Sequence, residues 1–235
     1  MVWDQEALGP SEPLQRKSLK DQIYHELRRR IILGEIPQGT RLLEPALAQM
    51  LETSITPVRE ALNKLAGADL VISMGRSGTY VRNLSDVDIE NLYELREALE
   101  RLAVRQSVGK FEADELERMQ ALGVEFFKTV RREEFVARNH ANTRFHMFFI
   151  TKSGNRWLKE SMANLNDLLT LARSGLERSG YRPPDSRSEV DDHQAILDAV
   201  RKHDVAGAED AMGRHIQRGK RYILDYLAQR SGRSE

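Results

Sequence analysis

The sequence of 235 residues contains no cysteine. This absence excludes a disulfide scaffold, a cysteine nucleophile, an iron–sulfur cluster and any thiolate zinc site, so a bound metal would need nitrogen and oxygen ligands. No apolar run approaches the roughly 18 residues of a membrane-spanning helix, and the first residues lack the basic-then-apolar pattern of a signal peptide. These absences favour a cytoplasmic protein without a membrane partner.

Net charge is absent as well, because 36 basic residues balance 36 acidic ones. The balance is uneven along the chain: residues 16–82 hold eleven Lys and Arg against seven Asp and Glu, whereas residues 1–15 hold three acids and no base. Neutralising DNA phosphates needs local basic surface, so this excess is a weak indication of nucleic-acid binding. The composition, 40% hydrophobic and 31% charged, is typical of a folded globular protein.

The length of the chain predicts two domains, and the first is expected over residues 16–83, after a mobile tail over residues 1–15. Apolar residues recur every four positions after Ser18 and predict a helix that stops at Gly34: Leu19, Ile23, Leu27 and Ile31. Two short helices are expected next, over residues 44–51 and from about residue 55 to Asp69, the latter with Ser54 or Thr56 as its N-cap. Residues 71–81 predict a hairpin around two glycines.

Helix, helix, helix and hairpin is the order of a winged helix-turn-helix, although a small helical domain with a hairpin has the same pattern. Residues 84–231 carry almost no strand signal. Their heptad-like apolar spacing predicts helices over residues 86–108, 112–131, 134–153, 156–178, 188–203 and 206–229, with one extended loop over residues 179–188. The expected fold is therefore mainly α, an N-terminal winged helix-turn-helix plus a C-terminal all-helical bundle of about six helices.

Several segments of the first domain, in order and spacing, resemble the GntR family of bacterial transcription factors: residues 33–42 (LGEIPQGTRL), Leu47 and Ala48, 56–62 (TPVREAL) and 78–81 (GTYV). The helical remainder resembles the FCD effector domain of the FadR-like branch, at residues 94–96 (ELR), Leu99, Glu100, Phe145, His146, 153–155 (SGN), His193 and His215. The resemblance implies a homodimeric DNA-binding regulator, more often a repressor than an activator. It also implies a small carboxylate effector, often with a divalent metal.

On this resemblance, the second short helix reads the major groove and the hairpin loop reaches the DNA backbone or minor groove. Arg59, in the first turn of that helix, carries a fork of donors that can hold guanine O6 and N7 or a phosphate. The other expected DNA contacts combine hydroxyls, the N–H groups of a helix start and two further arginines: Arg41, Ser54, Thr56, Arg76 and Thr79. Pro45 and Ile55 replace basic residues that are common in the family, so the operator is expected to differ or to be held by fewer contacts.

The histidines suggest a metal site. Asn142 and His146 are four residues apart and therefore project from one face of a helix, while apolar neighbours are expected to turn His193 and His215 inward. The resemblance implies that these four residues hold one divalent ion, and Zn or Ni suits three imidazoles plus an oxygen. Asn142 stands where the family often has Asp, which removes a negative charge from the ligand set. The alternative is that the histidines are hydrogen-bonded core residues.

Arg96, on the first helix of the second domain, is the expected partner of an effector carboxylate, and Arg144 is a second candidate. An ion pair between Arg96 and Glu100, one helical turn away, is an equally good reading. Two other functions stay open, a metal-dependent helical-bundle enzyme and a structural or adaptor dimer. The sequence has no His-Glu-x-x-His run and no phosphate loop, which disfavours the enzyme.

Overall fold

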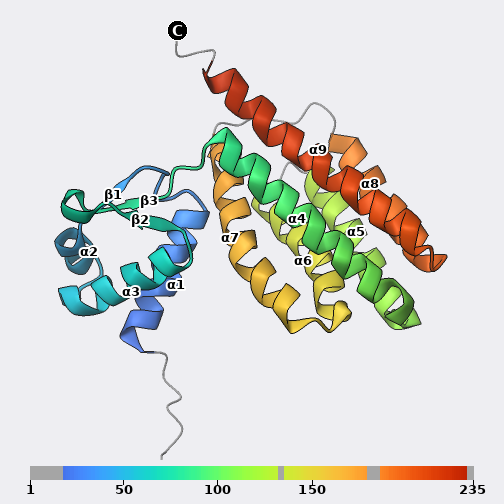
Figure 1. Ribbon diagram of the computed structural model, residues 1–235, viewed down its shortest axis with the longest axis horizontal. Helices are drawn as coiled ribbons and strands as arrows, with labels where there is room; N and C mark the ends of the chain where they lie inside the picture. The colour runs from blue at the N-terminus through green and yellow to red at the C-terminus, as the bar shows by residue number, and fades with distance from the viewer. Residues whose placement is uncertain (1–17, 132–134, 179–185, 232–235) are drawn as a thin grey trace, which may run out of the picture.

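The computed structural model describes residues 18–131, 135–178 and 186–231 (Figure 1). The expected tail over residues 1–15 and most of the expected loop over residues 179–188 lie outside the described residues. Within those ranges, an N-terminal domain (residues 18–83) of three helices and a small sheet adjoins a helical domain (residues 84–231). This arrangement confirms the mainly α fold of a winged helix-turn-helix followed by a helical bundle.

The first helix, α1 (Leu19–Ile32), has the bounds that its apolar period predicts. Ser18 caps it by accepting a hydrogen bond from the backbone N–H of Asp21, and Gly34, with a φ of +70°, follows its end. Its apolar face packs against α3 (Ile55–Gly67). The two helices bury Ile23, Leu27 and Ile31 together with Val58, Ala61, Leu62 and Leu65, which form the core of this domain.

The helix-turn-helix consists of α2 (Glu44–Met50) and α3, which are separated by a short turn in which Glu52 has a φ of +51°. Pro45 is accommodated in the first turn of α2, where its missing N–H has no intrahelical partner to lose. Ser54, and not Thr56, occupies the N-cap position of α3, and its side chain makes no capping hydrogen bond.

A three-stranded antiparallel sheet forms the wing, in the order β1-β3-β2. The hairpin of β2 (Val71–Ser73) and β3 (Thr79–Val81) is predicted by the sequence, and β1 (Arg41–Leu42) adds an edge strand that pairs with β3. A short 3-10 helix, Gly75–Ser77, lies in the hairpin loop. Gly78 has a φ of +104°, and a Cβ at this position would lie 3.2 Å from Arg41 Nε. The wing therefore favours glycine at position 78 for its backbone conformation, and the Arg41 side chain would have to shift slightly for any other residue.

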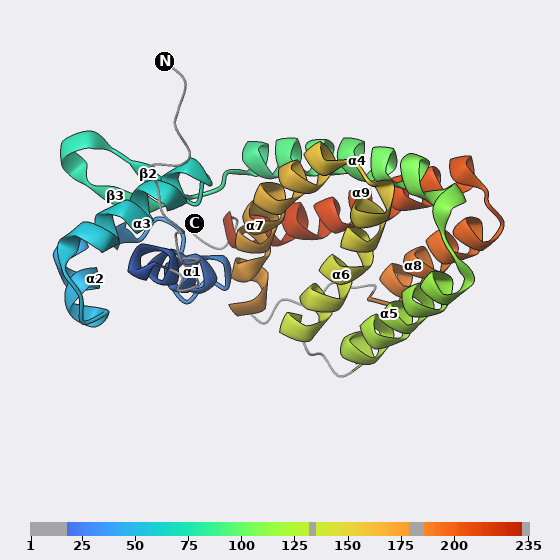
Figure 2. The same ribbon diagram turned by 90° about the horizontal axis from the view of Figure 1, so that it is seen from below.

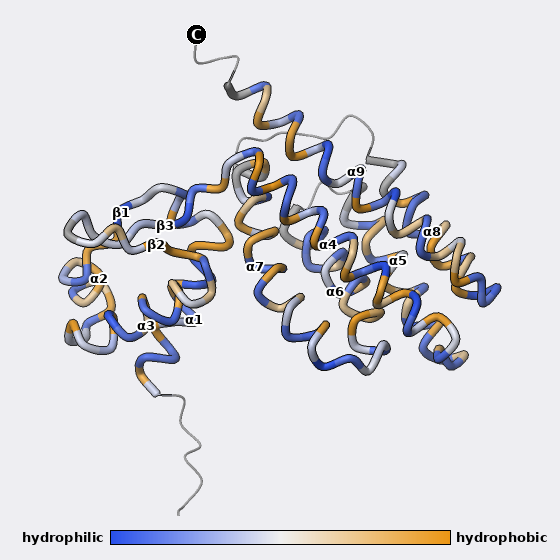
Figure 3. The backbone as a smooth tube through the Cα atoms, viewed as in Figure 1, coloured by the Kyte–Doolittle hydropathy of each residue, from blue (hydrophilic) through white to orange (hydrophobic). Residues whose placement is uncertain are grey.

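The helical domain contains the six expected helices, with bounds within a few residues of those predicted: α4 (Asp86–Ser107), α5 (Ala113–Arg131), α6 (Phe135–Ser153), α7 (Arg156–Arg178), α8 (Ser186–Arg201) and α9 (Val205–Ser231). The helix α9 packs along α4 and α8, and α5 packs against α6 (Figures 1 and 2). Hydrophobic and hydrophilic residues alternate along these helices (Figure 3), so each helix can bury one face. In the described ranges, no helix is long and apolar enough to cross a membrane.

The helix α7 lies between the N-terminal domain and the rest of the bundle (Figures 1 and 2). Two side chains of the N-terminal domain bind it. Arg28 of α1 forms a two-pronged ion pair with Asp167, in which Nε lies 2.5 Å from Oδ2, and the amide of Gln38 donates to the carbonyl of Leu171 at 3.0 Å. Gln38 Oε1 also accepts the backbone N–H of Leu84 at the start of the helical domain. The helix α7 thus provides two of the contacts that join the domains.

Candidate DNA interface and candidate metal centre

The start of α3 presents three of the expected DNA contacts to solvent. Ser54, Thr56 and Arg59 are all exposed, and the Arg59 side chain is 61% exposed. Of the expected wing contacts, Arg41 is exposed beside the wing, with its guanidinium carbon 6.0 Å from the centre of the Tyr80 ring. Thr79 begins β3, and Arg76 lies in the 3-10 turn of the hairpin loop.

An acidic residue that the sequence analysis did not single out faces Arg59. Glu44, at the start of α2, accepts hydrogen bonds from Arg59 Nε and Nη2 at 2.7 to 3.1 Å. These hydrogen bonds raise the pKa of Arg59 above its ordinary value and lower that of Glu44. Two carboxylate oxygens offer a guanidinium the same paired acceptors as guanine O6 and N7. Glu44 therefore occupies the paired donors of Arg59 in this structure.

Three buried histidines from three helices converge inside the helical domain. One ligand nitrogen from each of His146, His193 and His215 lies within 4.8 Å of the others, and their exposed fractions are 2%, 2% and 6%. The Nε2 atoms of His146 and His215 are 3.1 Å apart. Asn142, one turn before His146 on α6, places its Oδ1 3.3 Å from His146 Nε2. The structure thus brings the four expected metal ligands together.

Two carboxylates lie behind these histidines. Glu100, itself buried, contacts His146 Nδ1 and also accepts a 2.6 Å hydrogen bond from Arg96 Nε. Burial alone would raise the pKa of Glu100, but the charges of Arg96 and the contact with His146 hold it below its ordinary value. Glu100 is therefore ionised, so the Nδ1 of a neutral His146 carries the proton and Nε2 keeps the lone pair that a cation needs. On the other side of the cluster, Asp192 Oδ2 lies 3.7 Å from His215 Nδ1.

The protonation state of the cluster also suits a metal. Burial lowers the pKa of His146 and of His215 from 6.5 to about 4, because a charged imidazole is poorly solvated there. Both side chains are consequently neutral at pH 7, which is the form that binds a cation. Three imidazole nitrogens and an amide oxygen fit Zn or Ni by the chemistry of the donors.

We expect the metal-free protein to lose stability as the pH falls from about 6.5 to about 4. In the unfolded chain the two histidines titrate near pH 6.5, whereas in the folded protein the pKa of each is about 4, so the unfolded state binds more protons across this interval. The free energy of unfolding should then fall by about 1 kcal/mol per pH unit for each histidine. Urea unfolding of chelator-treated protein between pH 7 and pH 4.5 measures this slope.

The matched control is the exposed His140 of α6. Replacing His146 and His215 by Gln should flatten the pH dependence in this interval, whereas His140→Gln should leave it close to that of the parent. Equal slopes for the parent and the double variant would contradict the assignment of two buried neutral histidines.

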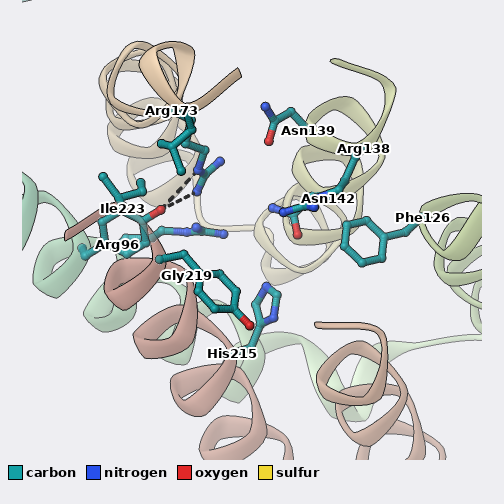
Figure 4. Close-up of a pocket in the computed structure, with 12 residues that line it drawn as sticks. Arg96, Phe126, Arg138, Asn139, Asn142, Arg173, His215, Gly219 and Ile223 are labelled. Carbon is teal, nitrogen blue, oxygen red and sulfur yellow. Dashed lines mark hydrogen bonds between the residues drawn. The ribbon is translucent and has the colours of Figure 1, made fainter. Parts of the chain in front are cut away.

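A compact cavity of about 60 Å³ opens beside this cluster, between α4, α6, α7 and α9 (Figure 4). Arg96 lines it and pairs with Glu100, which confirms the predicted ion pair, while its contact with an effector stays a prediction. The sequence analysis missed Arg138 and Arg173, which also line the cavity. Nothing in the local sequence around either arginine indicates this position, because four helices must pack before the cavity exists.

Arg144, the second expected effector contact, lies outside this cavity. Its guanidinium is exposed and donates two hydrogen bonds of 3.0 Å to Glu125 of α5. It lines a groove between α5 and α6, away from the arginine-lined cavity. The physical reason is the helical period: on α6, residues 142 and 146 share the inward face, and residue 144 points away from it.

Two parts of the chain match known protein families. Residues 19–81 match the gntR family of bacterial regulatory proteins, and residues 91–218 match the FCD domain. The first match contains the helix-turn-helix and the wing, and the second contains the histidine cluster and the cavity. Because the FCD match alone covers more than half of the chain, it establishes the family of the helical domain.

Relatives and a solved structure agree with these matches. The chain is 30% identical over 212 residues to the "Probable D-xylose utilization operon transcriptional repressor" of Paenarthrobacter nicotinovorans, covering 88% of this chain and 89% of that protein. It is 26% identical over 209 residues to the "Gluconate operon transcriptional repressor" of Bacillus subtilis, covering 88% and 85%. The structure of E. coli McbR/YncC has the same fold, with a TM-score of 0.77 at 21% identity and coverage of 90% and 100%. The chain therefore belongs to the GntR family and is a DNA-binding transcriptional regulator with a C-terminal FCD domain.

Proposed function

We propose that the protein is a homodimeric repressor whose affinity for operator DNA changes when a small carboxylate metabolite binds in the helical domain together with a divalent metal. The observation that carries this proposal is the convergence of His146, His193 and His215 beside an arginine-lined cavity, in the same chain as a helix-turn-helix. Imidazoles bind the cation and guanidinium groups bind the carboxylate. The family and its repressor relatives favour this function over a metal-dependent enzyme and over a structural dimer.

For DNA recognition, we propose that α3 enters the major groove and that Arg59 leaves Glu44 to contact a base edge or phosphate. Ser54 and Thr56 would bind phosphates at the helix start, and the wing would contribute Arg41, Arg76 and Thr79. One short helix contacts few bases. Two copies related by a two-fold axis would bind a pseudo-palindrome and double these contacts.

For the metal, His146, His193 and His215 would be the main ligands, Asn142 a weak fourth, and Zn or Ni the ion. The support is the short distance between the nitrogen atoms and the neutral state of the imidazoles. A bound ion would supply a positive charge to which a metabolite carboxylate can also bind. Arg96, held by Glu100, would face that carboxylate from α4.

Asn142→Asp is expected to tighten metal binding by about tenfold or more, because it places a negative charge in a neutral ligand set. The affinity is measured by competition with a chromogenic chelator for Zn. Asn139→Asp is the matched control, since Asn139 lines the same cavity on the same helix but is not an expected ligand. An equal gain in both variants would show a general effect of charge and would contradict coordination by residue 142.

Fluorescence anisotropy tests the proposed function as a whole. The probe is a labelled fragment selected from genomic DNA by the full-length protein, and the protein is used both Zn-loaded and chelator-treated. We expect tight binding to this fragment and at least a tenfold change in affinity on adding one member of a panel of small organic acids, in the Zn-loaded protein alone. Failure to select any DNA fragment, or an identical response without metal, would contradict the proposal.

A further inference from the structure

The cavity beside the histidine cluster has more cationic groups than one carboxylate requires. Arg96, Arg138 and Arg173 line it, and no Asp or Glu does among the residues that the structure describes. The charge of Arg96 is balanced by Glu100, with which it forms a buried ion pair. The other two arginines come from α6 and α7, on opposite sides of the cavity (Figure 4). Of these arginines, Arg173 has a neutral hydrogen-bond partner, the Tyr93 hydroxyl.

Of Arg138 and Arg173, Arg173 has the better defined contacts. It is half-buried, and its Nε and Nη2 donate hydrogen bonds of 3.2 and 3.1 Å to the hydroxyl of Tyr93. This neutral hydroxyl orients the guanidinium but supplies no opposite charge, and no carboxylate pairs with Arg173 among the side chains that the structure describes. Holding a cation away from water without a counter-charge costs free energy, and an anionic ligand group would offset that cost.

The positions of these groups suggest two anion subsites. In Figure 4, Arg173 lies at the upper end of the cavity and His215, a member of the histidine cluster, lies at the lower end. Asn139 and Asn142 of α6 lie along the side of the cavity, where their amides can contact neutral parts of a ligand. Both ends line the same cavity, so one ligand with a short chain can reach both of them.

We propose that the effector is a compact dianion, with one carboxylate at the histidine cluster and a second anionic group, a carboxylate or a phosphate, at Arg173. This inference rests on the proposed function, because it takes the first carboxylate from that proposal. It adds that Arg173 determines specificity and that Tyr93 positions it. The cavity then discriminates against monocarboxylates, because a ligand whose single carboxylate lies at the histidine cluster leaves no anionic group at Arg173.

Calorimetric titration of the full-length Zn-loaded protein with matched pairs of acids tests the inference. The pairs are lactate and malate, propionate and succinate, and glycerate and 3-phosphoglycerate; the third pair separates a phosphate from a carboxylate as the second group. We expect the dianion to bind about tenfold more tightly or better in at least one pair, and no monoanion to bind more tightly than its partner, because a charge-assisted hydrogen bond is gained.

The variants assign this preference to a residue. In Arg173→Gln the ratio of dianion to monoanion affinity should fall below about threefold. Arg173→Lys should recover part of this ratio, because lysine restores the positive charge but not the paired N–H donors of a guanidinium. Arg144→Gln is the matched control because Arg144 is an arginine of the same domain outside the cavity. If Arg173→Gln does not fold, Tyr93→Phe takes its place in the comparison, because it removes the hydroxyl that orients Arg173 and should also lower the ratio.

The outcomes are distinct. Equal binding within every pair overturns the dianion but leaves the proposed carboxylate response standing. A preference for dianions that survives in Arg173→Gln overturns the role of Arg173. No binding by any of the six acids, with or without Zn, counts against both the inference and the proposed function.

Discussion

Arg59→Ala is expected to weaken operator binding by about 30-fold or more, while binding to unrelated DNA changes much less. A paired contact to a base edge contributes about 1 to 3 kcal/mol, and the proposed two-fold symmetric dimer would lose two of them. The helical domain should remain folded, because the Arg59 side chain is 61% exposed and fills no core volume. Anisotropy titrations with the selected fragment and with a scrambled fragment of equal length, both at 0.15 M salt, measure the two affinities.

Arg105→Ala is the control for this experiment. Arg105 is also an exposed arginine that forms a two-pronged pair with a glutamate, Glu209, but it lies in the helical domain. Its loss should leave both affinities close to those of the parent. If Arg59→Ala protects the operator as well as the parent does, α3 does not read DNA through this residue. A parallel loss on both fragments would instead make Arg59 a phosphate contact.

His146→Ala should abolish two properties at once, stoichiometric metal and the response to effector, while operator binding stays within about twofold of the parent. The substitution removes the histidine that contacts both His215 and Asn142, so the set of three imidazoles is lost. The N-terminal domain is expected to be unaffected because its own helices bury its core residues, including Leu27 and Leu65. Elemental analysis of untagged protein gives the metal content, and anisotropy gives the response.

His140→Ala is the control, since His140 lies on the same helix but is exposed. It should retain both metal and response. Thermal denaturation of each variant without ligand shows whether the loss of His146 has unfolded the bundle, and His215→Gln provides a second, less disruptive test of the same site. Parent protein that contains no metal and takes up none from added Zn or Ni would mean that the three histidines serve the core or bind the effector directly.

The elements of this fold follow closely from the sequence because each helix must bury one face. Leu27 and Ile31, one turn apart, are both fully buried, as the four-residue period predicts. The same geometry explains why Asn142 and His146 can be paired from their spacing alone. The N-cap of α1 can also be predicted from local sequence, because Ser18 and Asp21 interact within one turn.

Contacts between distant elements could not be predicted in this way. Glu100 and His146 are 46 positions apart, and Arg28 and Asp167 are 139 apart. Which residues form such pairs depends on how the helices pack. From charge alone, many other acidic residues of this chain would be equally plausible partners for Arg28 or His146. The ion pair of Arg59 with Glu44 was hidden for the same reason, since it spans the turn of the helix-turn-helix. Residues whose role depends on tertiary packing, Arg173 among them, therefore emerge only from the structure.

The position of α7 has a consequence for the metabolite concentration to which the protein would respond in a cell. This helix contributes Arg173 to the cavity and, within the two preceding turns, Leu171 and Asp167 to the contact with the N-terminal domain. A coupling free energy carried by such a helix is reciprocal: if the effector lowers the affinity for DNA by some factor, DNA lowers the affinity for effector by the same factor. For a repressor released by its effector, clearing an occupied promoter then takes a higher metabolite concentration than a titration of the free protein would indicate, in proportion to that factor.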